Sequence, residues 1–335
     1  MKFTTKIYIA LFSLISIAFI LINFVLAERI HKPIAYFTLW NEKALNNYTL
    51  VRSIANELKK EENGGFIPKG ILSTTYTKFR KQDLNIVIWP RFQIPSVENK
   101  EQSYIWLLES PISIDLPITE KYTGFFKKIF TWHKPSVDNK QIFYLPIPYP
   151  YNRIIRNDTL ENKEYLISQI ATYHKGHNYT LREKMVIWLL ENHPEDFRFF
   201  GKNWPEVLNK LSKNAQTHFF KQYGDFIEDK LFEVSKSKFS LAFENARHDD
   251  YVSEKIYDVM VAGTVPIYSG APNIKEYVPE ACYIDFHAFK DYEELYNFIS
   301  TMSDEKYLSY LSCIKDFLKE PEKLENHYLN VQKTF

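Results

Sequence analysis

Residues 238–279 constrain the fold of this chain more than any other stretch, because they combine a strand, a helix and a second strand in one short unit. Large apolar side chains alternate with small or polar ones from 239 to 243, the period of a strand with one apolar face. Apolar residues recur at helical spacing from 252 to 260, and Gly263 suits the position just past a helix end. A second apolar strand over 264–268 completes a βαβ crossover, which predicts an α/β sheet with a polar loop where such sheets bind ligands.

The first turn of the predicted helix contains a charge conflict. Asp249 and Asp250 are candidate N-caps, and Lys255 lies near the positive end of the helix dipole, where an anion is favoured. A phosphate or diphosphate bound by backbone N–H groups and by Lys255 would remove the conflict, and Glu254 could then accept hydrogen bonds from ligand hydroxyls. A solvated Glu254–Lys255 pair is the alternative that the residues alone leave open.

The same stretch resembles the donor-binding signature of the α1,3/α1,4-fucosyltransferases, glycosyltransferase family 10. Residues 243–272 read FENARHDDYVSEKIYDVMVAGTVPIYSGAP, with the F-E-N, Y-x-S-E-K and A-G-x-V-P segments of that family at the family's spacing. A weaker resemblance extends from about Tyr104 to the C-terminal helices. It implies a GT-B fold, which is α/β with two Rossmann-like domains facing a central cleft, and an inverting transfer from GDP-fucose.

The resemblance also assigns donor contacts to residues of this stretch. By the family's pattern, Asn245, Tyr251, Glu254 and Lys255 contact GDP-fucose, with Lys255 at the diphosphate and Glu254 near the fucose. Ser240 stands where many relatives carry Tyr, so no aromatic contact to the nucleotide is assigned to that position.

A second candidate site lies where the apolar strand predicted over 104–108 runs into Glu109, Ser110 and Pro111. The carboxylate is at the carboxyl tip of the strand, in the crevice position of an α/β sheet, and the proline fixes the exit of the chain. A Glu109 that only caps a following turn is the alternative. Members of the resembled family have E-S-P at this place, which implies that Glu109 is the catalytic base and takes the proton of the attacking sugar hydroxyl.

Arg182 opens the helix predicted over 181–192. Relatives commonly have an Arg at the start of this helix, which implies a guanidinium beside the donor diphosphate. An exposed Arg with an ordinary i,i+4 contact is the alternative. The chain has no CxxC or HExxH pattern, and we interpret the Asp249–Asp250 pair as capping rather than as a metal site. We therefore expect no obligatory cofactor and no metal in the site, with a divalent metal at most stimulating turnover.

The leading hypothesis is an enzyme that transfers L-fucose from GDP-fucose to an N-acetylglucosamine-containing glycan, with α1,3 linkage expected. A GT-B transferase for another nucleotide sugar and a catalytically silent, membrane-tethered glycan-binding protein are the alternatives. Glu109 and the intact Glu254–Lys255 pair argue against the silent protein. The formal net charge of +1, with basic and acidic residues interspersed, argues against a nucleic-acid partner.

Residues 7–27 are uncharged and mostly apolar, and this run is long enough to cross a bilayer as a helix. A signal anchor is the prediction, and a cleavable signal peptide is the competitor, although its apolar region would exceed the usual length of about 7–15 residues. Lys2 and Lys6 precede the run and predict a type II orientation, a bias that Arg29 and Lys32 weaken. The body would then face the Golgi lumen in a eukaryote, and the protein would otherwise be membrane-associated.

Three N-glycosylation triplets, at Asn47, Asn157 and Asn178, are compatible with a lumenal body. The two cysteines, Cys282 and Cys313, form either one bridge or two buried thiols, and the sequence leaves both open.

Prolines between 146 and 150 indicate a linker between two domains, which the length of the chain accommodates. The predicted organisation is a cytoplasmic stub and signal anchor at 1–28, an acceptor-side Rossmann-like domain at 29–156, a GDP-fucose-binding Rossmann-like domain at 157–320 and a tail at 321–335. The expected partners are GDP-fucose, a glycan acceptor and the membrane.

Overall fold

The computed structural model describes residues 34–39, 67–72, 84–88, 100–111, 114, 116–118, 120–147, 159–175, 180–225 and 227–319. The predicted anchor, the asparagines of the three glycosylation triplets and the tail lie outside these residues, as do the predicted domain boundaries at 28, 156 and 320, which stay predictions. Within the described part, no helix is both long and apolar enough to cross a membrane. By its contacts the chain divides into two units, and every site residue discussed below lies in the unit of residues 89–94, 106–124 and 128–335.

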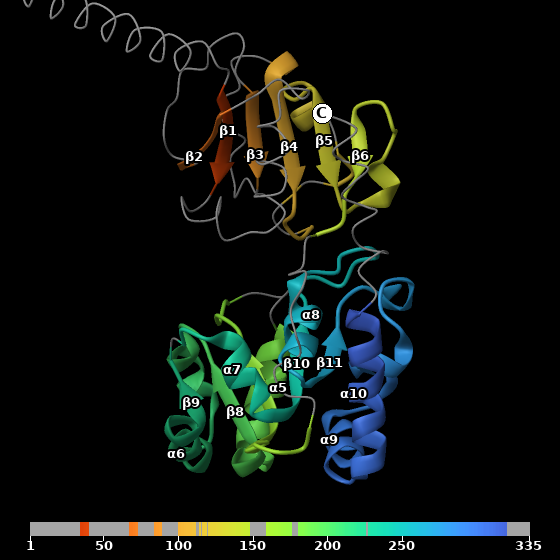
Figure 1. Ribbon diagram of the computed structural model, residues 1–335. Coiled ribbons are helices and arrows are strands. Elements are labelled where there is room, and N and C mark those ends of the chain that lie inside the picture. The colour runs from red at the N-terminus through yellow and green to blue at the C-terminus, as the bar shows by residue number, and fades with distance from the viewer. Residues whose placement is uncertain are drawn as a thin grey trace, which may run out of the picture. The chain divides into compact units, whose positions relative to one another are not determined.

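The described strands form two six-stranded sheets (Figure 1). The first has the strand order β2-β1-β3-β4-β5-β6. Its strands are β1 (Ile34–Leu39), β2 (Ile67–Leu72), β3 (Leu84–Ile88), β4 (Ser103–Leu107), β5 (Lys128–Thr131) and β6 (Ile142–Tyr144). The pairs β1–β2, β1–β3 and β5–β6 are parallel. Every described residue of β4 is buried, which explains its nearly continuous apolar sequence.

The second sheet is parallel throughout and has the order β12-β11-β10-β7-β8-β9. Its strands are β7 (Tyr165–Ile170), β8 (Phe197–Phe200), β9 (Tyr223–Gly224), β10 (Ser237–Phe243), β11 (Val265–Ser269) and β12 (Ile284–Asp285). The first and fourth strands in sequence, β7 and β10, are neighbours, and the chain winds outward from them in both directions. This is the doubly wound order, in which ligands bind at the carboxyl ends of the two central strands.

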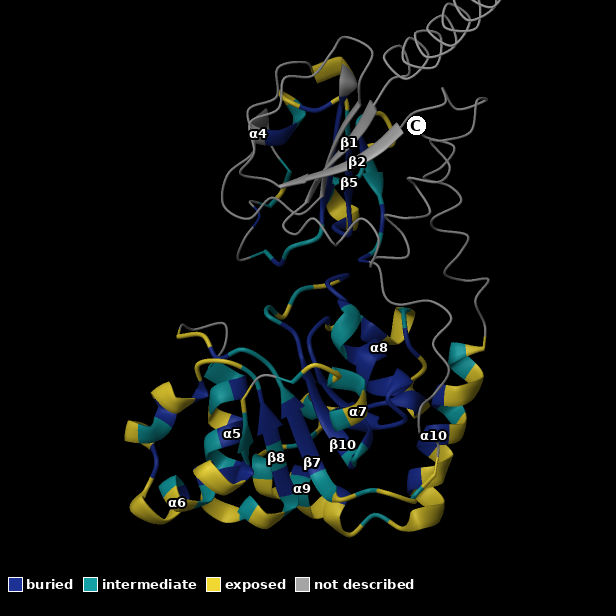
Figure 2. Ribbon diagram, turned by 60° about the vertical axis from the view of Figure 1, so that its left-hand side comes forward, coloured by how far each residue is buried: buried dark blue, intermediate teal, exposed yellow. Residues whose placement is uncertain are grey.

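Helices cover the second sheet. They are α5 (Thr180–Asn192), α6 (Lys213–Gln222), α7 (Lys230–Ser235), α8 (Glu254–Val261), α9 (Tyr292–Ser300) and α10 (Asp304–Leu318), and the short α4 (Glu120–Thr123) lies beside β5. Helix α7 packs against α8, and both contact β10. Figure 2 shows β10 almost wholly buried and β7 and β8 buried or intermediate, whereas exposed residues lie on α6, α9 and α10. The helices α5 and α8 follow the two central strands, so their first turns lie at the carboxyl edge of the sheet.

The start of α8 corrects one prediction. Ser253, and neither Asp249 nor Asp250, is the N-cap of this helix. Asp250 has a φ of 66° and is buried, and its carboxylate accepts hydrogen bonds from the Tyr277 hydroxyl and the Asn273 amide at 2.6 and 2.9 Å. The capping interpretation is therefore wrong, because Asp250 is used to bind the loop before the helix to the segment around 273–277.

The other end of α8 ends as the sequence predicts. Ala262 is the C-cap, and Gly263 follows it with a φ of 76°, the left-handed conformation that glycine adopts without steric cost. The chain then enters β11, so the predicted strand-helix-strand unit is confirmed.

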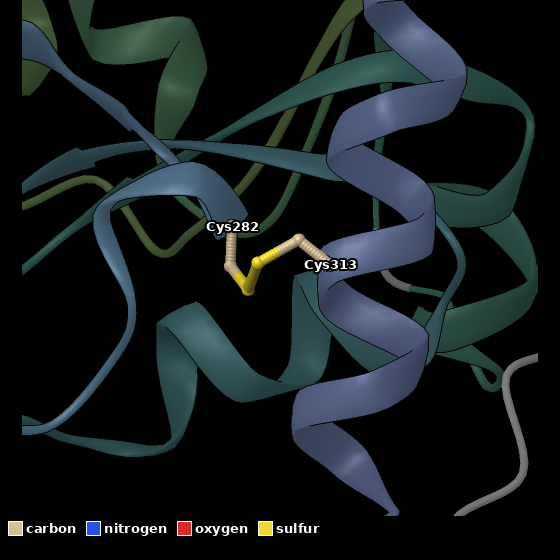
Figure 3. Close-up of a disulfide and its surroundings, with 2 residues drawn as sticks. All are labelled: Cys282 and Cys313. Carbon is tan, nitrogen blue, oxygen red and sulfur yellow. A yellow bond between two sulfur atoms is a disulfide. The ribbon is translucent and has the colours of Figure 1, made fainter.

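A disulfide joins Cys282 to Cys313 with 5.2 Å between the Cα atoms (Figure 3). It connects the turn before β12 to the middle of α10. Of the two alternatives that the sequence left open, the bridge is the one found.

Candidate functional site

A pocket lies at the carboxyl edge of the second sheet, where the strand order reverses between β7 and β10. Its described lining includes Ile170, Arg182, Lys230, Ser240, Phe243 and Lys255. The charged residues of this described lining are all cations, and they come from three different helices. Such an edge, with two helix N-termini and several cations, suits a ligand that carries phosphate groups.

Lys255 lies in the first turn of α8, as predicted. Its Nζ atom is 2.9 Å from Ser253 Oγ, 3.3 Å from Glu244 Oε2 and 3.6 Å from Glu254 Oε1. Burial alone would lower the pKa of Lys255, but the Glu254 and Glu244 carboxylates raise it above its usual range. The side chain is therefore a stable ammonium group on the pocket wall.

Glu244 is a residue that sequence reasoning missed. Its side chain has no exposed surface, and its carboxylate accepts hydrogen bonds from the Ser253 backbone N–H at 2.7 Å and the Ser253 hydroxyl at 2.6 Å. The anion that the helix start requires is thus already supplied by the protein. In the sequence, the only signal for this role of Glu244 was its position directly after an apolar strand and nine residues before Ser253.

Glu254 begins α8 and keeps 46% of its side chain exposed. Burial raises the pKa of this carboxyl, but the charges of Lys255 and Lys230 outweigh that effect and hold it below its usual range. Glu254 is therefore ionised at neutral pH and can accept hydrogen bonds from ligand hydroxyls.

Arg182 lies in the first turn of α5 and is 7% exposed, so the alternative of an ordinary surface arginine is wrong. Its Nη2 atom donates to the Phe243 carbonyl at 2.5 Å and to Asn245 Oδ1 at 3.4 Å. Arg182 thereby joins the start of α5 to the end of β10. It also orients Asn245, a residue that is predicted to contact the donor. Its charge also acts on Lys255 and opposes, without cancelling, the rise in the Lys255 pKa.

Tyr251 is 3% exposed and lies between the two predicted sites. Its ring centroid is 5.0 Å from that of Trp132, and the Ser110 side chain acts to lower the pKa of its hydroxyl. Burial raises its pKa well above the usual range, and the carboxylates of Glu244, Glu254 and Glu109 add to that effect. The hydroxyl is therefore neutral across the physiological range.

Glu109 follows β4 and is half-buried. Its backbone carbonyl accepts a hydrogen bond from Trp132 Nε1 at 3.0 Å, and its carboxylate acts on Tyr251. The charge of the predicted base Glu109 thus acts on Tyr251, one of the residues predicted to contact the donor. Whether Glu109 is the base or caps a turn stays a prediction.

The described residues contain no group of three or more His, Cys, Asp or Glu side chains arranged to hold a metal ion. Asp250, one of the two adjacent aspartates, pairs with Lys134 Nζ at 2.9 Å. The expectation that no metal is obligatory remains a prediction.

Residues 179–333 match the sequence pattern of a family described as "Glycosyltransferase family 10 (fucosyltransferase) C-term". The 4-galactosyl-N-acetylglucosaminide 3-alpha-L-fucosyltransferase 9 of Mus musculus is 34% identical over 155 residues, or 44% of this chain and 42% of the relative. The Homo sapiens protein of the same name is 33% identical over the same length and shares. A putative fucosyltransferase-like protein of Arabidopsis thaliana is 51% identical over 51 residues, 15% of this chain and 10% of that protein. The chain therefore spans about two fifths of the length of the fucosyltransferases it matches.

Solved structures resemble the fold over most of the chain. A structure of an α1,3-fucosyltransferase with GDP aligns with a TM-score of 0.52 and 17% identity, covering 84% of this chain and 82% of that one. Anabaena Alr3699/HepE in complex with UDP and glucose aligns with a TM-score of 0.57 and 9% identity, covering 91% and 99%. Together with the two parallel sheets, these likenesses confirm the predicted α/β, GT-B-like fold.

Proposed function

We propose that the protein is an inverting fucosyltransferase, because residues 179–333 match the pattern of glycosyltransferase family 10, the family that the sequence resembles. It transfers L-fucose from GDP-fucose to a hydroxyl of an N-acetylglucosamine-containing glycan, in α1,3 linkage. The observation that carries the proposal is the pair of cations Arg182 and Lys255, each in the first turn of a helix at the same sheet edge. Helix N-termini and cations at one edge suit the diphosphate of a nucleotide sugar.

In this proposal the pocket binds the donor. Lys255 contacts the diphosphate, and Arg182 adds positive charge while it orients the Asn245 amide toward the ligand. The ionised Glu254 accepts hydrogen bonds from hydroxyl groups of the donor sugar. The buried hydroxyl of Tyr251 is neutral, and the carboxylates of both Glu254 and Glu109 raise its pKa, which supports a place for Tyr251 between the donor sugar and the base.

The transfer is a single displacement at C1 of fucose. An acceptor hydroxyl oxygen attacks C1 from the face opposite GDP and forms the new C–O bond, while the bond from C1 to the β-phosphate oxygen breaks. Glu109 takes the hydroxyl proton, and GDP leaves with the electron pair. Lys255 and the helix N-terminus stabilise the charge that develops on the leaving phosphate, so no bound metal is required.

The protein is further proposed to be a single-pass type II membrane protein, anchored by residues 7–27 with its body in the Golgi lumen if the host is a eukaryote. The uncharged run and the preceding lysines support this, and the Cys282–Cys313 bridge fits an oxidising compartment. Protease protection of the full chain in sealed microsomes tests the orientation. Digestion of the body without detergent would contradict it.

The central experiment measures GDP release and product formation with the full chain in detergent. GDP-fucose, GDP-mannose and UDP-glucose are offered with an N-acetyllactosamine acceptor, and the product linkage is read by NMR. We expect turnover with GDP-fucose alone and an α1,3 product. Faster release from another nucleotide sugar would overturn the assignment of the donor.

The same panel tests the second candidate, a GT-B transferase for a UDP-sugar. What raises this candidate is the shared fold, since a structure that contains UDP and glucose aligns with a TM-score of 0.57. A protein that binds the acceptor but releases no nucleotide from any donor would instead be the silent glycan-binding protein.

A further inference from the structure

We infer that Lys230 is a third cation of the donor site and that its ammonium group pairs with a phosphate of the nucleoside diphosphate. The inference rests on the proposed function, since it concerns the same pocket. Lys230 belongs to none of the motifs that identify the family in this sequence, and the structure alone brings it to the site.

Lys230 is the first residue of α7 and lines the pocket together with Arg182 and Lys255. Helix α7 packs against α8 and contacts both central strands, β7 and β10. The position of Lys230 is therefore fixed by α8, which carries Lys255, and by the two central strands.

The charge of Lys230 acts within the site. Together with Lys255, it holds the pKa of the Glu254 carboxyl below its usual range. Its own ion-pair partner is Asp258, with 3.0 Å between Nζ and Oδ2. Asp258 lies one turn after Glu254 on α8, and the described pocket lining includes Lys230 but not Asp258.

This asymmetry distinguishes a ligand-binding lysine from a structural one. The Lys230 side chain is 37% exposed and lines the pocket, whereas Asp258 is 11% exposed and is not part of the lining. A partly exposed ion pair contributes little to stability. A cation at the edge of an anion-binding pocket contributes when a phosphate arrives, and most when GDP gains charge as the sugar leaves.

Calorimetry on the full chain tests the inference, with GDP and guanosine as probes. We expect Lys230→Ala to bind GDP about tenfold more weakly than wild type, because one charge-assisted contact to phosphate is lost. Guanosine lacks phosphate, so its affinity should not change. The loss for GDP should shrink at high salt, which screens a partly exposed charge.

Two matched variants serve as controls. Lys236→Ala removes a lysine from the other end of α7, where it pairs with Glu233 outside the described pocket lining, and should bind both probes as wild type does. Asp258→Asn breaks the same ion pair as Lys230→Ala but leaves the pocket cation in place, so it should bind GDP at least as tightly as wild type. If Lys230→Ala does not fold, Lys230→Gln takes its place.

Equal GDP affinity in wild type and Lys230→Ala overturns the inference and leaves the proposed function standing. Equal losses in Lys230→Ala and Asp258→Asn also overturn it, because they assign the ion pair to the fold. A wild-type chain that binds no GDP overturns the proposed function and the inference with it.

Discussion

Two strands of this protein, β4 and β10, end close to a glutamate, and the two glutamates lie in different surroundings. Glu244 after β10 has no exposed side-chain surface and binds Ser253 and Lys255. Glu109 after β4 is half-buried, and its charge acts on the hydroxyl of Tyr251. A carboxylate at the tip of an apolar strand can therefore hold the fold together or be available for chemistry. The hydrogen-bond donors that surround it decide between these two roles.

The largest expected effect is on Glu109. Glu109→Gln keeps the shape of the side chain but cannot take the hydroxyl proton, so fucose transfer should fall about 10²–10⁴-fold while GDP binding survives. The loss should appear in kcat more than in the donor KM, because the proton moves only in the transition state. Transfer is measured per folded molecule beside GDP calorimetry. A folded and fully active variant would show that the base is another residue.

Glu244→Gln tests the other side of the comparison. It removes the charge that faces Lys255 and one of the acceptors of Ser253, and should reduce the free energy of unfolding by about 2 kcal/mol. Urea unfolding measures this loss, and Glu109→Gln is the matched control, with a change of at most about 0.5 kcal/mol. If the two variants are equally stable, the assignment of a structural role to Glu244 and not to Glu109 is wrong.

Lys255→Ala tests whether the lysine at the start of α8 binds the donor or only pairs with Glu244. GDP affinity should fall about tenfold, because a charge opposite the diphosphate is lost. Lys255→Arg should rescue poorly, since the planar guanidinium does not replace a compact ammonium group. Calorimetry with GDP measures both, and Lys238→Ala, a lysine paired with Asp304, is the control. Unchanged affinity in Lys255→Ala would remove Lys255 from the site.

The smallest effect concerns Glu254, a third and half-exposed glutamate. Its folded-state pKa is lowered by Lys255 and Lys230 against the opposing effect of burial, so the stability it contributes is present above the ordinary carboxyl pKa of about 4.3 and is lost as the pH falls through the lower folded value. The unfolding free energy of wild type should therefore fall more steeply than that of Glu254→Gln over that acidic window. Parallel curves would mean that Lys255 and Lys230 do not act on this carboxyl.

The sequence predicts the strand-helix-strand unit well because its signals are local. Alternation from 239 to 243 and glycine at 263 each depend on neighbours in the chain. The N-cap of α8 was mispredicted because two aspartates precede the serine that takes this role, and Asp250 bonds instead to Tyr277, far along the chain.

Contacts between distant segments explain the other misses. Glu244 reaches Ser253 across a loop, and Lys230 reaches the pocket only because α7 packs on α8. Arg182 was correctly placed at a helix start, yet its burial against the Phe243 carbonyl depends on the neighbouring positions of β7 and β10 in the sheet. The spacing of motifs in the sequence therefore predicts which residues contact a ligand. The topology of the fold decides which further residues pack against those residues or bond to them.

The bridge between Cys282 and Cys313 has a consequence for how the protein must be made. It closes a covalent loop with a sequence separation of 31 residues, and a cross-link of that size reduces the conformational entropy of the unfolded chain by an amount equivalent to roughly 3.5 kcal/mol. The loop contains α9 and most of α10, whereas the described pocket lining lies before it in the chain. In a host with a reducing cytosol the pocket residues would be unchanged, but α10 would no longer be cross-linked to the turn before β12, so an oxidising host is the one to choose for the experiments above.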